Sequence, residues 1–310
     1  MNKENTIQLS VVIPVFNEEK GLFHFIGQLE ETFKDLSQYE LIFVDDGSSD
    51  NTWDIIKNKN QSNKRVRGIR FSRNFGHQPA IMAGLRAVKG DFVGIMDGDG
   101  QDPPDVLKEM FEKCLDSYDV VYAVRKKRES GLVKKLAYLI YYRIINQIVP
   151  FDMPLDSGDF SVMKRKVVDF ITLQKEQFPY IRGLRSWYGG EQLGIEYNRP
   201  GRMEGESKYS YKKLLILAIQ GITSFSKVPL RIATVVGVII SLGGIVYGLF
   251  NIIRKLFFGL PYPGYTSLIV AVTFLGGLQI LLLGIIGEYI GNIFEDQRSK
   301  PQYIIDEGIE

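Results

Sequence analysis

Cysteine and histidine are nearly absent from this chain of 310 residues. Cys114 is the single cysteine, and His24 and His77 are the only histidines. One cysteine cannot form an intrachain disulfide, and these three residues cannot supply the usual ligands of a zinc site. Any metal ion must therefore be held by oxygen ligands. The length excludes a miniature, disulfide-stapled fold, because 310 residues suffice for about two domains with a sizeable core.

A large net charge is also missing. Lys and Arg number 38 and Asp and Glu number 36, so the net charge of +2 gives no reason to expect a nucleic acid polymer as partner. The charges are unevenly distributed along the chain. Between residues 229 and 290 the charged residues are Arg231, Arg254, Lys255 and Glu288.

Two uncharged runs in this region, at 232–253 and 264–287, each exceed the ~20 residues that a helix needs to cross a bilayer. We predict two transmembrane helices joined by a short loop at 254–263, where Pro261 and Pro263 interrupt any helix. The alternative is a buried helical hairpin of a soluble protein. Soluble helices of this length, however, nearly always carry a polar stripe.

Basic residues are concentrated outside the two runs. Only Arg254 and Lys255 lie between them, and the positive-inside rule therefore predicts that both termini are cytoplasmic. No apolar run opens the chain, so we expect no signal peptide and no export of the N-terminal domain. The flanking basic residues are Lys208, Lys212, Lys213, Lys227, Arg231, Arg298 and Lys300.

Ahead of these runs, short apolar segments typical of strands alternate with segments of helix length. The apolar segments are 9–15, 41–44, 66–71, 92–96 and 120–124. This alternation predicts an α/β fold with a parallel, doubly wound sheet. Ligands of such sheets bind at the carboxyl ends of the strands, where polar residues follow the first four segments. These are Asn17, Glu18, Glu19, Asp45, Asp46, Gly47, Ser48, Arg73, Asn74, Gly76, Asp97, Gly98 and Asp99.

Asp97 and Asp99 stand one residue apart at a predicted strand end. Both carboxylates can approach one divalent cation, and Mg²⁺ prefers one or two carboxylates together with phosphate oxygens and water. Aspartates are also common in ordinary turns. Asp102 is expected to cap the next helix. Asp45 and Asp46 suit hydrogen bonds to a nucleobase or a ribose, or else belong to a glycine turn before a capped helix.

The combined motifs resemble the family-2 glycosyltransferases with a GT-A (Rossmann-like) fold. The closer resemblance is to the polyprenyl-phosphate sugar transferases, which include dolichol-phosphate mannose synthases and bactoprenol glucosyltransferases. It covers nearly the whole chain, and the loop Gly205-Glu206-Ser207-Lys208-Tyr209-Ser210 before a paired membrane anchor is its most specific part. The other matching segments are 12–19, 71–76, 97–104, 156–160 and 181–184 with Trp187.

Two positions depart from the family pattern. Gly98 stands where these enzymes often carry alanine, which leaves both neighbouring carboxylates intact. His77 stands where the family often has lysine, and we therefore assign it no role.

The resemblance implies an inverting, metal-dependent transferase. The expected reaction moves glucose or N-acetylglucosamine from a UDP-sugar to undecaprenyl phosphate. Asp97 and Asp99 would bind Mg²⁺ or Mn²⁺. Asp97, Asp99 and Asp159 would be catalytic, Asp159 either as a base or by orienting the acceptor. The residues expected to bind the nucleotide sugar are Pro14, Asn17, Glu18, Asp45, Asp46, Arg73, Gly76, Asp97 and Gln101.

A lipid monophosphate is largely a dianion at neutral pH and needs positioning more than deprotonation. The candidates to hold it are Arg182, Arg202 and Lys208, since arginine can grip phosphate through two parallel hydrogen bonds. The alternative for each is a solvated basic face that meets anionic lipid headgroups.

The expected organisation is a cytoplasmic GT-A catalytic domain at 1–198, an acceptor loop and juxtamembrane helix at 199–230, two transmembrane helices at 231–290, and a cytoplasmic tail at 291–310. This describes a multi-pass protein of the bacterial inner membrane that contacts membrane lipids. A homo-oligomer, a flippase and a second, polytopic glycosyltransferase are further partners to consider.

Two other functions share part of this pattern. A processive polysaccharide synthase has the early motifs but normally needs a Gln-x-x-Arg-Trp motif and more spans, and neither is visible. A membrane-anchored nucleotide- or lipid-binding protein without activity is the second, and the intact pair Asp97 and Asp99 argues against it.

Overall fold

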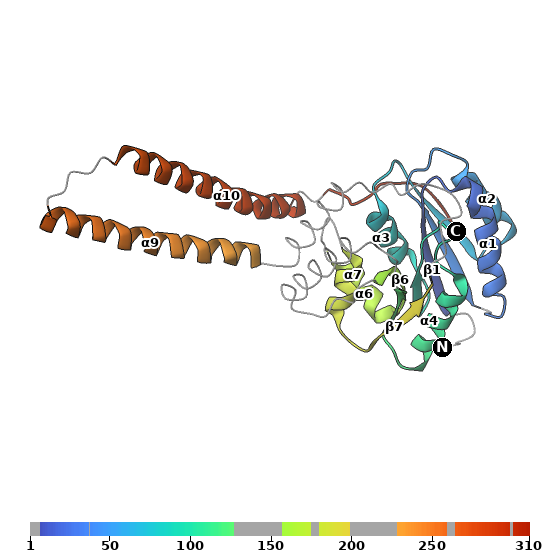
Figure 1. The fold of residues 1–310 in the computed structure, drawn as a ribbon. Helices are drawn as coiled ribbons and strands as arrows, with labels where there is room; N and C mark the ends of the chain where they lie inside the picture. Colours follow the sequence, from blue (N-terminus) through green and yellow to red (C-terminus); the bar gives the residue numbers. More distant parts are fainter. Residues whose placement is uncertain are drawn as a thin grey trace. The chain divides into compact units, whose positions relative to one another are not determined.

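The chain folds into two compact units. The first is an α/β domain built on one mixed sheet, and the second contains a pair of long apolar helices (Figure 1). A computed structural model of the protein describes residues 7–36, 38–126, 157–174, 180–198, 228–258, 264–297 and 300–310.

Four parallel strands form the centre of the sheet, with β1 between β2 and β4 and with β3 beside β2. They coincide with the first four predicted strands, so the alternation of apolar runs correctly identified this part of the fold. Their carboxyl ends share one edge. The strands are β1 (Leu9–Val15), β2 (Tyr39–Asp45), β3 (Val66–Phe71) and β4 (Phe92–Ile95), and the helices that follow them are α1 (Glu19–Thr32), α2 (Thr52–Ser62), α3 (His77–Ala87) and α4 (Pro104–Asp116).

The fifth predicted strand is present as β5, and it pairs with two strands, β6 and β7, that the sequence did not predict. Strand β6 is antiparallel to both β4 and β5, and β7 is parallel to β5. The register that pairs Ile95 with Ser161, continued two residues past β4, brings Asp97 opposite Asp159. Strand β6 therefore begins at the edge where the parallel strands end. These elements are β5 (Val120–Arg125), β6 (Ser157–Lys164), α6 (Arg165–Leu173), α7 (Ile181–Tyr188) and β7 (Gln192–Tyr197).

Hydrophobic side chains fill a core on each face of the sheet. Val11 and Ile13 of β1 belong to the core under α1, α2 and α4, whereas Val12 belongs to the core under α3, α6 and α7 (Figure 1). Successive strand residues point to opposite faces, so a strand covered on both sides needs an unbroken apolar run. Helix α3 comes closest at Gly84, where a Cβ would lie 2.2 Å from a methyl of Val12.

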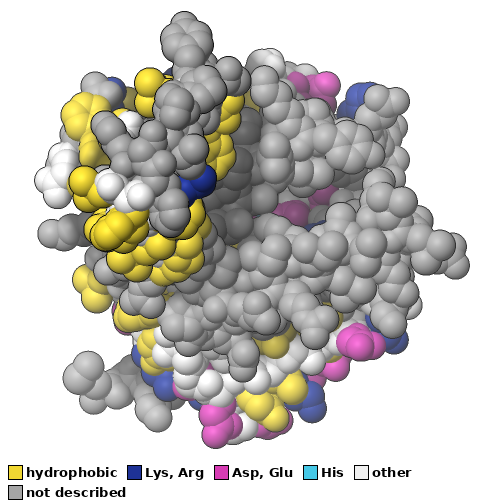
Figure 2. Space-filling model, turned by 60° about the vertical axis from the view of Figure 1, so that its left-hand side comes forward, with side chains coloured by type: hydrophobic (Ala, Val, Ile, Leu, Met, Phe, Trp, Pro, Cys, Tyr) yellow, Lys and Arg dark blue, Asp and Glu magenta, His cyan; other side chains and the backbone are white. Residues whose placement is uncertain are grey.

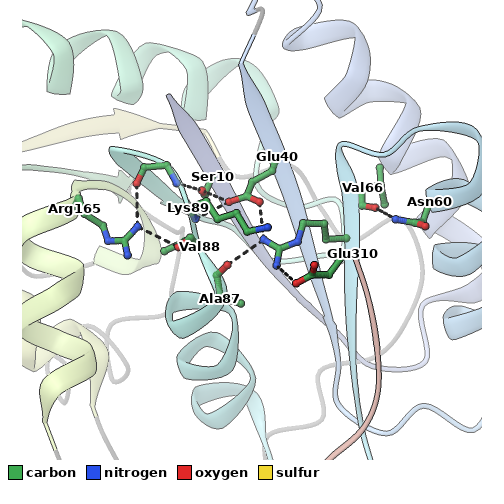
Figure 3. Close-up of polar contacts among 11 residues, drawn as sticks. Ser10, Glu40, Asn60, Val66, Ala87, Val88, Lys89, Arg165 and Glu310 are labelled. Carbon is green, nitrogen blue, oxygen red and sulfur yellow. Dashed lines mark hydrogen bonds and ion pairs between the residues drawn. The ribbon is translucent and has the colours of Figure 1, made fainter. Parts of the chain in front are cut away.

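A buried carboxylate ties together the opposite, amino-terminal edge of the sheet. Glu40 accepts hydrogen bonds from the Ser10 hydroxyl at 2.6 Å, the Lys89 amide at 2.7 Å and the Arg67 guanidinium at 2.7 Å (Figure 3). Its three donors compensate for the cost of burying the charge. The side chain of Glu310 approaches Arg67 at 3.6 Å from the other side.

The C-terminal residues add the last described strand, β8 (Ile305–Ile309), which pairs antiparallel with β3. Tyr303 stacks on Phe71 with ring centroids 4.9 Å apart, and Glu307 accepts a hydrogen bond from the Trp53 indole at 2.8 Å. The segment expected as a tail from residue 291 thus first continues a helix and then enters the sheet. This strand covers the edge of β3, which would otherwise expose unpaired backbone groups.

The second unit contains helices α9 (Val228–Phe258) and α10 (Tyr265–Gln297), which contact each other. Two stretches within them, Ala233–Phe250 and Val270–Gly291, are long and apolar enough to cross a membrane, with mean hydropathy of 2.1 and 2.2. Their hydrophobic side chains are exposed to the surroundings and gather on the face shown in Figure 2. Both predicted apolar helices are therefore present, and each is longer than its uncharged run.

Candidate active site at the carboxyl ends of the strands

The Asp97-Gly98-Asp99 turn follows β4 and is held from several sides. The Gly98 amide donates to the carbonyl of Pro14 at 3.3 Å, which ties the turn to the end of β1. Asp99 accepts a hydrogen bond from the Gln101 amide at 3.0 Å. The turn therefore places Asp97, Asp99 and Gln101 next to Pro14 at the end of β1, and three of these four were expected to bind the nucleotide sugar.

Asp102 supports this turn and does not cap α4, which corrects the expectation. Its carboxylate accepts hydrogen bonds from the Asp97 amide at 3.1 Å and from the Tyr197 hydroxyl at 3.1 Å. Helix α4 instead begins after Pro103, without a side-chain cap. Because Asp102 is 1% exposed, its role is to fix the turn that presents Asp97 and Asp99.

A divalent cation fits the chemistry of this turn. Asp97 and Asp99 offer carboxylate oxygens, and the side chain of Asp97 is 30% exposed. The described part of the chain contains no cluster of three or more His, Cys, Asp or Glu residues that could hold a metal alone. Two carboxylates, completed by phosphate oxygens and water, form the coordination that Mg²⁺ prefers.

The loops after β1 and β2 are joined by hydrogen bonds. Asn17 has a φ of 55°, a left-handed conformation that asparagine tolerates better than most residues. Its amide donates to the Ser48 hydroxyl and its side-chain oxygen accepts from the Ser49 amide, both at 2.9 Å. The Glu18 amide donates to the Thr52 hydroxyl at 2.9 Å. Asn17 and Glu18 thus shape the rim of the site.

Asp45 and Asp46 are buried beneath these loops. Asp45 accepts from the Ser48 amide at 2.9 Å, and Asp46 accepts from the amides of Phe75 at 2.7 Å and Gly76 at 2.9 Å. Burial raises the pKa of both carboxyl groups, and these hydrogen bonds oppose the increase. In this geometry both side chains stabilise loops, and their expected direct contact with a nucleotide stays a prediction.

The loop after β3 carries Arg73, whose guanidinium lies 4.5 Å from the centre of the Phe75 ring. Gly76 has a φ of 109° and immediately precedes α3. Arg73 is exposed at the rim, in keeping with the expected contact with a donor. That contact also stays a prediction.

Asp159 of β6 faces two arginines of α7. Arg182 forms an ion pair with Asp159 at 3.3 Å and donates to the Ser157 carbonyl at 3.1 Å. Arg185, which is 1% exposed, donates to the Gly158 carbonyl at 3.3 Å, and burial lowers its pKa to about 10. The structure therefore brings together Asp159 and Arg182, two of the predicted residues, and adds Arg185.

We assigned no role to His77 from the sequence, but the structure places it between two carboxylates of the site. It is the first residue of α3, and its Nε2 lies 3.5 Å from Asp97 and 3.6 Å from Asp159. Partial burial lowers the pKa of His77, but its polar contact with Asp159 and the charges of both carboxylates raise it to about 9. The His77 ring thus lies between the Asp-Gly-Asp turn and Asp159. Its position directly after Gly76, in the loop that follows β3, was the sequence signal that could have identified it as a site residue.

The same contacts act on Asp159. Burial raises its pKa, but the hydrogen bond from His77 and the positive charges of Arg182, His77 and Arg185 outweigh burial and hold this pKa well below its usual range. Asp159 is therefore a permanently charged group at neutral pH. The other predicted phosphate-binding residues, Arg202 and Lys208, lie outside the described residues, as does the 205–210 loop.

Comparison with known proteins identifies the family of this chain. Residues 10–172 match the model of glycosyl transferase family 2, and residues 228–293 match the model described as the GtrB C-terminal hairpin. The chain therefore belongs to glycosyl transferase family 2 and combines its GT-A catalytic domain with this hairpin.

Several curated relatives match over nearly their full length. An uncharacterized glycosyltransferase of Bacillus subtilis, YkcC, is 42% identical over 98% of this chain and 95% of its own. A bactoprenol glucosyl transferase of Shigella phage SfV is 40% identical over 96% of this chain and 98% of its own. The Escherichia coli prophage bactoprenol glucosyl transferase homolog is 38% identical over 96% of this chain and 98% of its own.

Proposed function

We propose that this protein transfers a sugar from a UDP-sugar to a polyprenyl phosphate, undecaprenyl phosphate in a bacterium, on the cytoplasmic face of the membrane. The observation that carries the proposal is the meeting of Asp97 with Asp159 and Arg182 around His77. One half of this site suits a diphosphate and the other an anionic acceptor. The names of the Shigella phage and E. coli relatives, which refer to bactoprenol, support the choice of acceptor.

On the donor side, Asp97 and Asp99 would hold Mg²⁺ or Mn²⁺ against the diphosphate. When bound, the cation would stabilise the negative charge that develops on the departing nucleotide. Arg73 and the loops shaped by Asn17 and Asp46 would surround the nucleoside.

On the acceptor side, Arg182 would hold the lipid phosphate. Asp159 is buried and paired with His77 and Arg182. We therefore propose that it orients these two side chains and does not remove a proton. A phosphate that is already largely ionised needs no base. A phosphate oxygen would attack the sugar in one displacement and invert its anomeric configuration.

The chain path supports the topology. Only residues 298–304 separate the end of α10 from β8, which belongs to the sheet of the catalytic domain. If α9 and α10 cross the membrane as a hairpin, the catalytic domain and both termini lie on the same side. The excess of basic residues outside the hairpin makes that side cytoplasmic.

Transfer of radiolabel into a butanol-soluble lipid tests the proposal. Purified full-length protein would receive undecaprenyl phosphate and, in turn, UDP-glucose, UDP-N-acetylglucosamine, UDP-galactose or GDP-mannose, with Asp99→Asn as the inactive control. We expect transfer from one UDP-sugar. UDP binding without transfer would favour a binding protein, and label in a growing polymer would favour a polysaccharide synthase. Both outcomes contradict the proposal.

A further inference from the structure

Gln78 lies at the junction of the two halves of the site, although no sequence motif points to it. It is the second residue of α3, directly after His77. Its Nε2 donates to the Asp159 carboxylate at 2.9 Å, and its Oε1 accepts from the amide of Ile181 at 3.1 Å. The side chain of Gln78 therefore joins α3 to β6 and to the first residue of α7.

The chemistry of these two partners defines what this side chain must be. A carboxylate only accepts hydrogen bonds, and a backbone N–H only donates them. The group between them must therefore donate on one side and accept on the other. A primary amide does both without a charge, and the partners fix which end of the amide is nitrogen.

The contacts around Gln78 show what it positions. Asp159 has its other carboxylate oxygen 3.3 Å from Arg182, the residue after Ile181. Gln78 thus holds the start of α7 through its backbone and the partner of Arg182 through its side chain. A shift of either would move Arg182 relative to Asp97 and His77.

We propose that Gln78 is a positioning residue that aligns Arg182 and Asp159 for the acceptor phosphate. This inference rests on the proposed function. Gln78 acts through these two residues and contributes to acceptor use, while the donor is held by the turn and loops on the other side of the site.

Two variants of nearly equal size separate the hydrogen bonds. Gln78→Glu keeps an acceptor for Ile181 but sets a second carboxylate against Asp159, and Gln78→Met removes both hydrogen bonds. The matched control is Gln28→Glu, which adds the same charge to the exposed face of α1. All would be studied in the full-length protein.

Steady-state transfer from the active UDP-sugar to undecaprenyl phosphate provides the first measurement. For Gln78→Glu and Gln78→Met we expect kcat/KM for the lipid phosphate to fall about ten- to a hundredfold, with the KM for the donor unchanged. Gln28→Glu should behave as wild type. Wild-type kinetics in Gln78→Glu, or equal losses for donor and acceptor, would overturn the inference.

Hydrogen exchange provides a second measurement that needs no acceptor. In Gln78→Met the peptide containing Ile181 should exchange its amide protons faster than in wild type, while peptides of α1 and α2 keep their rates. Unchanged exchange at Ile181 would also overturn the inference. Failure of the wild-type protein to transfer sugar would refute the proposed function alone, since the exchange measurement tests the link through Gln78 independently.

Discussion

Gly47 lies in the loop after β2, where the added methyl group of an alanine should displace the neighbouring loop after β3. Its φ is +70°, and a Cβ there would lie 2.4 Å from the carbonyl carbon of Arg73, with the Arg73 Cα and O at 2.7 and 2.8 Å. All three atoms are backbone, so no side-chain rotation can relieve the contact. The change Gly47→Ala must therefore move the loop after β3, which carries Arg73.

Gly189 is a control for the positive φ. Its φ is +74° just after α7, and within the described residues nothing lies within 4 Å of the position that a Cβ would take there. A positive φ in a sparsely populated region costs a non-glycine residue about 1–3 kcal/mol, which both alanine variants incur. Overpacking adds about 1–3 kcal/mol for Gly47→Ala alone. We expect a total loss of about 2–6 kcal/mol for Gly47→Ala, against about 1–3 kcal/mol for Gly189→Ala.

Urea unfolding followed by tryptophan fluorescence measures the difference in stability between the two variants, because Trp53 is buried in the core under α1, α2 and α4. Calorimetric titration with UDP measures the consequence for the site. Gly47→Ala should unfold at lower urea and bind UDP more weakly, and Gly189→Ala should bind UDP normally. Equal stability of the two variants with intact UDP binding would refute the close approach of the loops.

The metal, the stereochemistry and the buried cysteine each give a further prediction. EDTA should abolish transfer, and Mg²⁺ or Mn²⁺ should restore it. Asp99→Asn should reduce kcat by about a hundredfold or more without a change in the urea unfolding midpoint. Full activity in EDTA would contradict the metal role. An α-linked donor should yield a β-linked glycosyl phosphate by NMR, and retention would exclude a single displacement. Burial raises the pKa of the Cys114 thiol to about 12, so Ellman's reagent at pH 8 should label it only in urea; rapid labelling of the folded protein would contradict its burial.

The central strands could be predicted because burial on both faces demands continuous apolar runs, as in β1 and β2. The position of Asp97 and Asp99 followed directly, since parallel strands end at one edge. Strand β6 was not among the predicted strands, and an apolar pattern would not have given its direction. Its antiparallel pairing with β4 places Asp159 at the site.

Strand β8 illustrates a second limit. Its sequence, Ile305-Asp306-Glu307-Gly308-Ile309, has no apolar run, and Asp and Gly are poor strand formers. Pairing with β3 and contacts far away in sequence, such as that between Glu307 and Trp53, stabilise it as a strand. Contacts of this kind leave no local signal, and the same holds for Gln78 and its partners Asp159 and Ile181.

The antiparallel strand β6 would allow one site to bind both substrates of the proposed reaction. The parallel strands present the Asp97 turn from one part of the chain, whereas β6 and α7 present Asp159 and Arg182 from another. His77 lies at the first turn of α3 and contacts a carboxylate from each part. In the proposed function, donor and acceptor would therefore meet at this one end of the strands, as direct transfer of the sugar from a diphosphate to a phosphate requires.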